Sequence, residues 1–164
     1  MLTALGDGAY WVGPWDVAAD LALYAPPLTY DSVVVLWQPW DEDDYVQSWG
    51  WGLGLAAGPY SNGLAYATIT APPPDATWWV TSMPFPGEVY LHEWLHGVID
   101  YHTAHGAQLP DLHGNATYGY VDEGGSWRRW YSDLMQQHLR DPLSGAWVGI
   151  NYRVWKAGTP STLP

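Results

Sequence analysis

The spacing of apolar and polar residues predicts strands in the first half of the chain and helices in the second. Residues 31–39 (DSVVVLWQP) contain an unbroken apolar run rich in β-branched side chains, as expected of a buried strand. Residues 63–70 (GLAYATIT) and 76–82 (ATWWVTS) predict two further strands. Residues 13–24, with Pro14 near their start, have instead the spacing of a helix.

Two longer helices are predicted after this strand region, which extends mainly over residues 31–82. The first covers about residues 86–105, because it starts with proline and Gly106 favours a C-terminal cap. The second covers about residues 126–140. Strands followed by helices, with no internal repeat, predict an α+β fold in a single domain over residues 1–164.

The charge distribution excludes several classes of partner. The 164 residues carry a net charge of −12, and no Lys or Arg precedes Arg128. Binding to nucleic acid or to an anionic membrane surface requires clustered cations, so neither is an expected partner. No apolar run is long enough to span a membrane, and no signal-peptide pattern is visible. The scarcity of Lys and Arg limits cleavage by trypsin-like proteases and suits a secreted protein. We expect the protein to be a monomer.

Aromatic residues and the absence of cysteine define the available chemistry. The chain has thirteen Trp, twelve Tyr and no Cys, so disulfides and thiolate metal sites are excluded. Most of the aromatic side chains are expected to build the core, while a sugar- or peptide-binding surface is the functional alternative. The acidic residues 41–44 predict either a solvated turn or a calcium loop. They lack the glycine and the distal glutamate of an EF-hand, so calcium binding there stays an open question.

The first long helix contains the motif HEWLH, which suits a zinc centre. His92 and His96 are four residues apart, so both imidazoles lie on one helix face, one turn apart, and can bind one ion. Glu93 is adjacent to His92, where its carboxylate can take a proton from a water held by the metal. The spacing therefore predicts a Zn²⁺ site with Glu93 as general base.

The segment HEWLHGVIDY resembles the active-site helix of the zincin metallopeptidases, most closely that of their thermolysin-like members. The close similarity covers about ten residues, and the order of strands, motif helix and second helix is similar more loosely. The resemblance implies a zinc-dependent metalloendopeptidase acting on a peptide or protein substrate. It also implies a small mixed sheet packed on the motif helix, with residues 63–70 or 76–82 as the strand at the edge of the substrate cleft. Asp100, one turn beyond the motif, is a candidate to orient a ligand histidine.

A catalytic zinc site requires a third protein ligand, and we adopt His113. It follows Gly106 by seven residues, which is enough chain to run back along about 20 Å of helix to the metal. Imidazole ligates zinc readily, and the neighbouring Pro110 and Gly114 suit a shaped loop.

Glu123 and His102 are the alternatives for the third ligand. Glu123 resembles the glutamate of gluzincins, but two glycines follow it and Ser126 suits an N-cap, so it is expected just before the second helix. His102 has the histidine spacing of metzincins, which carry glycine where this chain has Ile99. If the helix continues through Ile99, His102 faces about 120° away from His96.

Two questions about function stay open at the level of sequence. Tyr118 or Tyr120 could support the oxyanion of a tetrahedral intermediate, although ordinary packing is the simpler interpretation. A Trp-rich acidic binding module without catalysis, or a zinc hydrolase of non-peptide amides or esters, would also account for the same residues.

Overall fold

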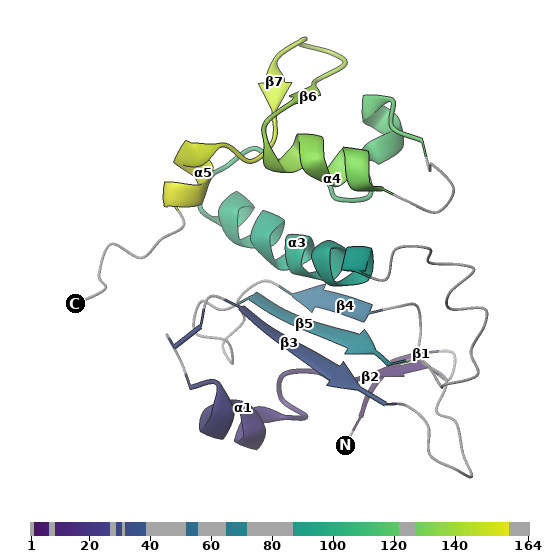
Figure 1. The fold of residues 1–164 in the computed structure, drawn as a ribbon, viewed down its shortest axis with the longest axis vertical. Coiled ribbons are helices and arrows are strands. Elements are labelled where there is room, and N and C mark those ends of the chain that lie inside the picture. The colour runs from purple at the N-terminus through teal and green to yellow at the C-terminus, as the bar shows by residue number, and fades with distance from the viewer. Residues whose placement is uncertain are drawn as a thin grey trace. The chain divides into compact units, whose positions relative to one another are not determined.

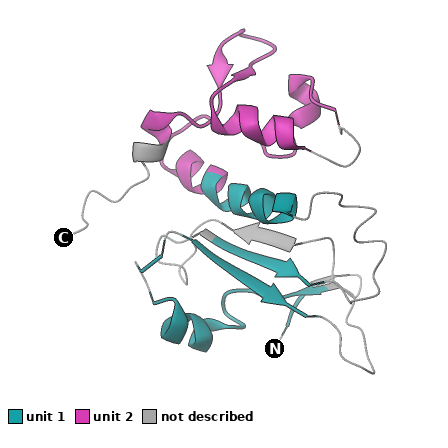
Figure 2. Ribbon diagram, viewed as in Figure 1, with its two compact units in different colours: residues 1–98 teal, residues 99–164 magenta. Residues whose placement is uncertain are grey.

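The computed structural model describes residues 2–6, 9–26, 29–30, 32–38, 52–55, 65–71, 87–121 and 127–157. These residues form a mixed fold of four α-helices and three small sheets (Figure 1). The chain divides into two compact units, residues 1–98 and 99–164, with the boundary inside one helix (Figure 2). In the described part of the chain, no helix combines the length and the apolarity that a membrane span requires.

The main sheet of unit 1 is mixed and has three strands. Its order is β3 (Ser32–Trp37), β5 (Ala65–Thr70) and β4 (Gly52–Leu55). β3 runs parallel to β5, with Ser32 opposite Ala65, and β4 runs antiparallel to it. The parallel pair requires a long crossover, since strands that run in the same direction cannot be joined by a tight turn.

Burial along these strands differs from the expectation for the apolar segment 31–39. No residue of β3 is fully buried, and Leu36 is 58% exposed. The buried strand is β5, in which Tyr66 through Thr70 are all at most 6% exposed. β5 has a hydrogen-bonded neighbour on each side, whereas β3 pairs only with β5 among the described strands, so position in the sheet outweighs side-chain apolarity. β5, the described part of the predicted strand 63–70, is therefore central among the described strands and not at an edge, and residues 76–82 lie outside the described residues.

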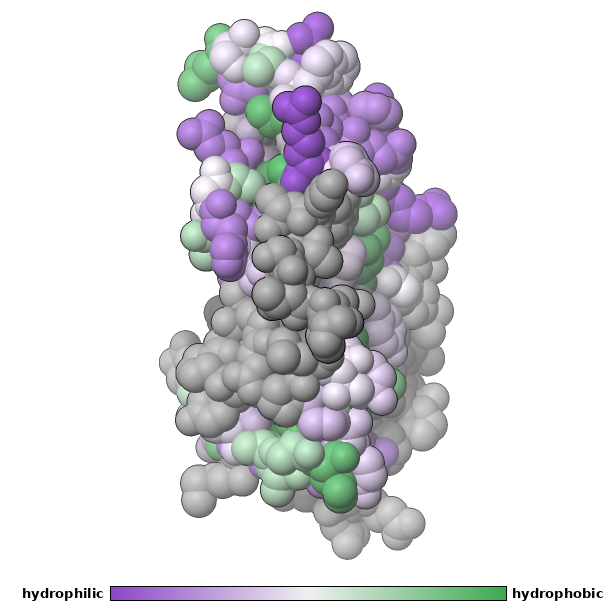
Figure 3. All heavy atoms as spheres, turned by 90° about the vertical axis from the view of Figure 1, so that its left-hand side faces the viewer, coloured by the Kyte–Doolittle hydropathy of each residue, from purple (hydrophilic) through white to green (hydrophobic). Residues whose placement is uncertain are grey.

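A hairpin and a short helix complete the N-terminal part of unit 1. β1 (Thr3–Gly6) pairs antiparallel with β2 (Ala9–Trp11), and α1 (Ala18–Tyr24) follows. The Asp16 carboxylate joins these parts by accepting hydrogen bonds at 2.8 Å from the Thr3 hydroxyl and from the Gly13 N–H. α1 has no buried residue, and hydrophobic side chains gather over it in the lower part of Figure 3.

Helix α3 (Gly87–Ala104) is the long helix expected at about 86–105. Its buried stripe includes Leu95, Ile99 and His102, which lie on one helix face because they are spaced at i, i+4 and i+7. Gly106 follows with φ +90, the left-handed conformation that ends helices and that glycine adopts without steric cost.

Unit 2 is built around a small apolar core. Its elements are η1 (Asn115–Tyr118), α4 (Arg128–Met135), β6 (Leu139–Arg140), β7 (Trp147–Val148) and α5 (Tyr152–Ala157). The side chains of Leu112, Trp130, Leu134, Leu139 and Ile150 are at most 2% exposed. The core therefore draws on the loop before η1, on α4 and on both sides of the β6–β7 hairpin.

The second predicted helix, about 126–140, is shorter than expected. α4 ends at Met135, and Gln137 has φ 56, which a right-handed helix cannot contain. The chain then forms β6, which pairs antiparallel with β7. Gly149, with φ +127, allows the close approach that follows, because a Cβ there would lie 2.5 Å from the Leu134 carbonyl oxygen.

Candidate metal centre

The two histidines of the HEWLH motif converge as their spacing requires. They lie one turn apart on α3, and both are half-buried. The Nε2 atoms of His92 and His96 are 3.1 Å apart, and the two rings stand at 89° to each other. Two nitrogens bound to one tetrahedral zinc at 2.0–2.1 Å would be about 3.3 Å apart. The observed pair is therefore already close to the spacing of two ligands on one ion.

His113 is held by an anchored loop. Its N–H donates a hydrogen bond of 2.7 Å to the Asp111 carboxylate, and the Gly114 N–H donates to the Asp111 carbonyl at 2.9 Å. Between them, the Leu112 side chain is only 2% exposed, and its carbonyl accepts a hydrogen bond of 2.9 Å from the Trp130 indole. The backbone on both sides of His113 is thus fixed, while its own side chain is exposed.

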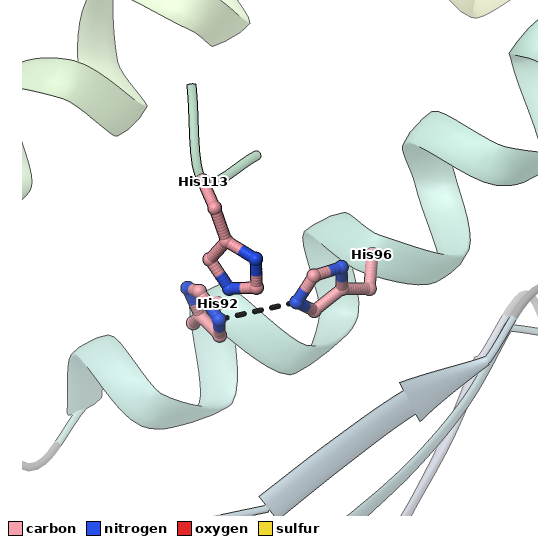
Figure 4. Close-up of side chains that lie close together, drawn as sticks. All are labelled: His92, His96 and His113. Atoms are coloured by element: carbon pink, nitrogen blue, oxygen red, sulfur yellow. Dashed lines mark hydrogen bonds between the residues drawn. The ribbon is translucent and has the colours of Figure 1, made fainter. Parts of the chain in front are cut away.

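The three histidines form one potential metal site. One ring nitrogen from each of His92, His96 and His113 lies within 4.8 Å of the other two, and Figure 4 shows the His113 ring directed at the pair on α3. Among the described residues this is the one group of three metal-binding side chains so arranged. Three imidazoles suit zinc or another transition ion of intermediate softness, and they leave a fourth tetrahedral position open. The residues therefore fit the group that the motif implies.

Of the two alternative third ligands, His102 does not join this group. α3 continues through Ile99 without a break, and His102 lies on its buried stripe at 6% exposure. Burial lowers the pKa of His102, and the nearby His105 lowers it further. Glu123 and the acidic residues 41–44 lie outside the described residues.

Two carboxylates of α3 have different surroundings. The side chain of Glu93 is 6% exposed, which is unusual for a charged residue and typical of a functional or paired group. Asp100, the candidate for orienting a ligand histidine, is exposed. Burial thus separates the expected general base from an ordinary surface carboxylate.

The two candidate tyrosines have structural roles in unit 2. Both rings pack against Trp130, with centroids at 5.5 Å for Tyr118 and 5.4 Å for Tyr120. The Tyr120 hydroxyl donates a hydrogen bond of 2.5 Å to the Asp133 carboxylate. Burial and this hydrogen bond raise the pKa of Tyr120 to about 12. Its only hydroxyl proton is therefore engaged by Asp133 and is not directed at an oxyanion.

Sequence reasoning missed the residues that position His113. Asp111 carries a signal, because aspartate two residues before a backbone N–H commonly accepts its hydrogen bond in a turn. Trp130 carries none, since its link to Leu112 joins positions 18 residues apart in the sequence. Comparison with family models, with curated proteins and with solved structures finds no match to this chain.

Proposed function

We propose that this protein is a zinc-dependent hydrolase of peptide bonds with a zincin-like fold. The observation that carries the proposal is the convergence of His92, His96 and His113, together with the buried Glu93 inside the same motif. The mixed sheet of unit 1, followed in the chain by α3 and then α4, is compatible with the order of elements that the resemblance implies.

The proposed ligands are the three imidazoles, each bound as the neutral ring. Because none of them brings a negative charge, the ion would keep its full double positive charge, which favours Lewis-acid chemistry. When bound, zinc polarises the scissile carbonyl and lowers the pKa of a water ligand.

Glu93 is the proposed proton carrier. Its carboxylate accepts a proton from the attacking water and then passes it to the nitrogen of the leaving amine. The acidic surface, with a net charge of −12, favours neutral or basic peptides through electrostatic steering.

Conversion of Glu93 to glutamine tests the mechanism. Glu93→Gln should bind one zinc per chain and lose hydrolysis of a fluorogenic peptide library by a factor of about 100 to 10,000. Glu88→Gln is the matched control, since Glu88 is also a buried carboxylate of α3, at 9% exposure, and should keep activity. Full activity in Glu93→Gln would falsify the mechanism.

Elemental analysis tests the centre independently of any substrate. The protein purified from zinc-containing medium should hold one zinc per chain, which the single substitutions His92→Ala and His96→Ala should each remove. A protein that takes up no zinc would support a binding module without catalysis. Zinc binding combined with hydrolysis of amides or esters, but not of peptides, would assign a different substrate class to the same centre.

A further inference from the structure

The β6–β7 hairpin of unit 2 borders an open pocket that the metal centre does not use. The pocket measures about 610 Å³ and is lined by Gln136, Gln137, His138 and Trp147. Its volume falls within the range of small-molecule sites in proteins. Its described lining consists of one indole, two amides and one imidazole. This composition suits a neutral, polar ligand with an apolar face.

Trp147 provides the flat surface of this pocket. It is 54% exposed, although it is one of the largest apolar side chains of the hairpin. The Arg140 guanidinium lies 4.3 Å from the centre of the indole ring and also donates a hydrogen bond to the Gly145 carbonyl. A cation held in this way fixes the orientation of the indole, so little conformational entropy remains to be lost when a ligand stacks on it.

The polar side of the pocket is fixed as well. Gln137 has φ 56, a conformation that is strained for a residue other than glycine and that clusters at functional sites. Its side-chain oxygen accepts a hydrogen bond of 3.0 Å from Asn151, and its amide nitrogen donates to the Trp147 carbonyl at 3.4 Å. Gln136 is tied to Ser132 at 2.8 Å. Each amide therefore keeps further donor or acceptor capacity in a defined place beside the indole.

We propose that this pocket is a carbohydrate-binding subsite. The C–H face of a pyranose stacks on Trp147, and its hydroxyl groups hydrogen-bond to the amides of Gln136 and Gln137 and to the ring of His138. In Figure 3 hydrophilic and hydrophobic side chains lie next to each other at the upper end, where this hairpin lies. The subsite does not depend on the proposed zinc chemistry.

Titration of the full chain with defined sugars tests the proposal. Hexasaccharides of β-1,4-linked glucose, β-1,4-linked N-acetylglucosamine and α-1,4-linked glucose are each added up to about 10 mM, with a chelator present so that metal plays no part. Calorimetry should detect weak binding of at least one of them. Trp147→Ala should weaken this binding at least about tenfold, the loss expected for one stacking contact.

Matched variants make the outcome decisive. Leu143→Ala changes a residue of the same hairpin that is 97% exposed and does not line the pocket, so its sugar affinity should equal that of the unchanged protein. If Trp147→Ala does not fold, Gln136→Ala replaces it, with the same expected direction. Absence of binding to all three sugars, unchanged affinity in the pocket variants, or binding of a neutral peptide in place of the sugars would each overturn the proposal.

Discussion

The anchor beneath His113 leads to a prediction that tests the site through a residue far from the motif. Trp130→Phe keeps an aromatic ring in the core of unit 2 and removes the indole N–H. That N–H donates the 2.9 Å hydrogen bond to the Leu112 carbonyl, and Trp130 itself is 1% exposed. The substitution therefore leaves a buried carbonyl without its donor and a gap where the second ring was.

The lost hydrogen bond and the lost ring together determine how much stability Trp130→Phe should lose. A buried carbonyl deprived of its hydrogen bond costs about 1–3 kcal/mol, and truncation of a core side chain adds about 1 kcal/mol or more. For a chain of this size we expect the Tm to fall by roughly 5–15 °C. Because Leu112 directly precedes His113, we also expect zinc affinity to fall about 10- to 100-fold, as when the hydrogen-bonded support of a metal ligand is removed.

Competition with a chromogenic chelator measures zinc affinity well below the melting temperature, so that lowered stability does not mimic weak binding. Trp15→Phe is the matched control, since the Trp15 indole also donates a hydrogen bond, to the Thr3 hydroxyl at 2.5 Å, but does so in unit 1. It should leave zinc affinity unchanged. If Trp130→Phe loses stability and yet binds zinc as tightly as the unchanged protein, the anchoring of His113 has no bearing on the metal.

Three further predictions rest on single side chains. His113→Ala should weaken zinc binding at least about 100-fold, because one of three ligands is lost, whereas His105→Ala should have no effect in the same chelator competition. Folding raises the pKa of Tyr120 from 10.0 to about 12, so its neutral form stabilises the folded state. This contribution to the free energy of unfolding is fully present below pH 10 and should disappear between pH 10 and about pH 12. Tyrosinate absorbance compared with Tyr120→Phe measures it, and a pKa near 10 would contradict the hydrogen bond to Asp133. His102, with its pKa lowered from 6.5, stabilises the metal-free fold fully above about pH 6.5 and less as the pH falls through its lowered pKa. Chemical unfolding at several pH values should show a smaller decline for His102→Leu, and an equal decline would refute this reasoning.

The motif helix could be predicted almost to the residue, because its signals are local. Apolar spacing, an early acidic residue and Gly106 define α3, and four-residue spacing alone places His92 beside His96. His113 could be proposed as a metal ligand because the loop after Gly106 is long enough to return to the motif. The contacts that fix its backbone could not all be predicted. The Leu112 carbonyl meets Trp130 only through tertiary packing.

The sheet and the end of α4 could not be predicted because their causes are not local. β3 is more apolar than β5, yet β5 is the buried strand because it lies between two others among the described strands. The helix expected up to residue 140 ends five residues earlier with no proline or glycine at the break. Gln137 takes a positive φ there, and the close approach of Gly149 to Leu134 follows. No pattern within 126–140 indicates a contact with residue 149.

Unit 1 contains eleven acidic residues and neither Lys nor Arg, so no ion pair between a carboxylate and Lys or Arg can form within it. Its carboxylates repel one another, and dissolved ions weaken that repulsion over distances of about 10 Å at 0.1 M. Added sodium chloride should therefore make this half of the molecule harder to melt, the opposite of what is seen where attraction between opposite charges holds a fold together. An N-terminal half that melts at a higher temperature in salt would follow directly from a sequence whose first arginine is residue 128.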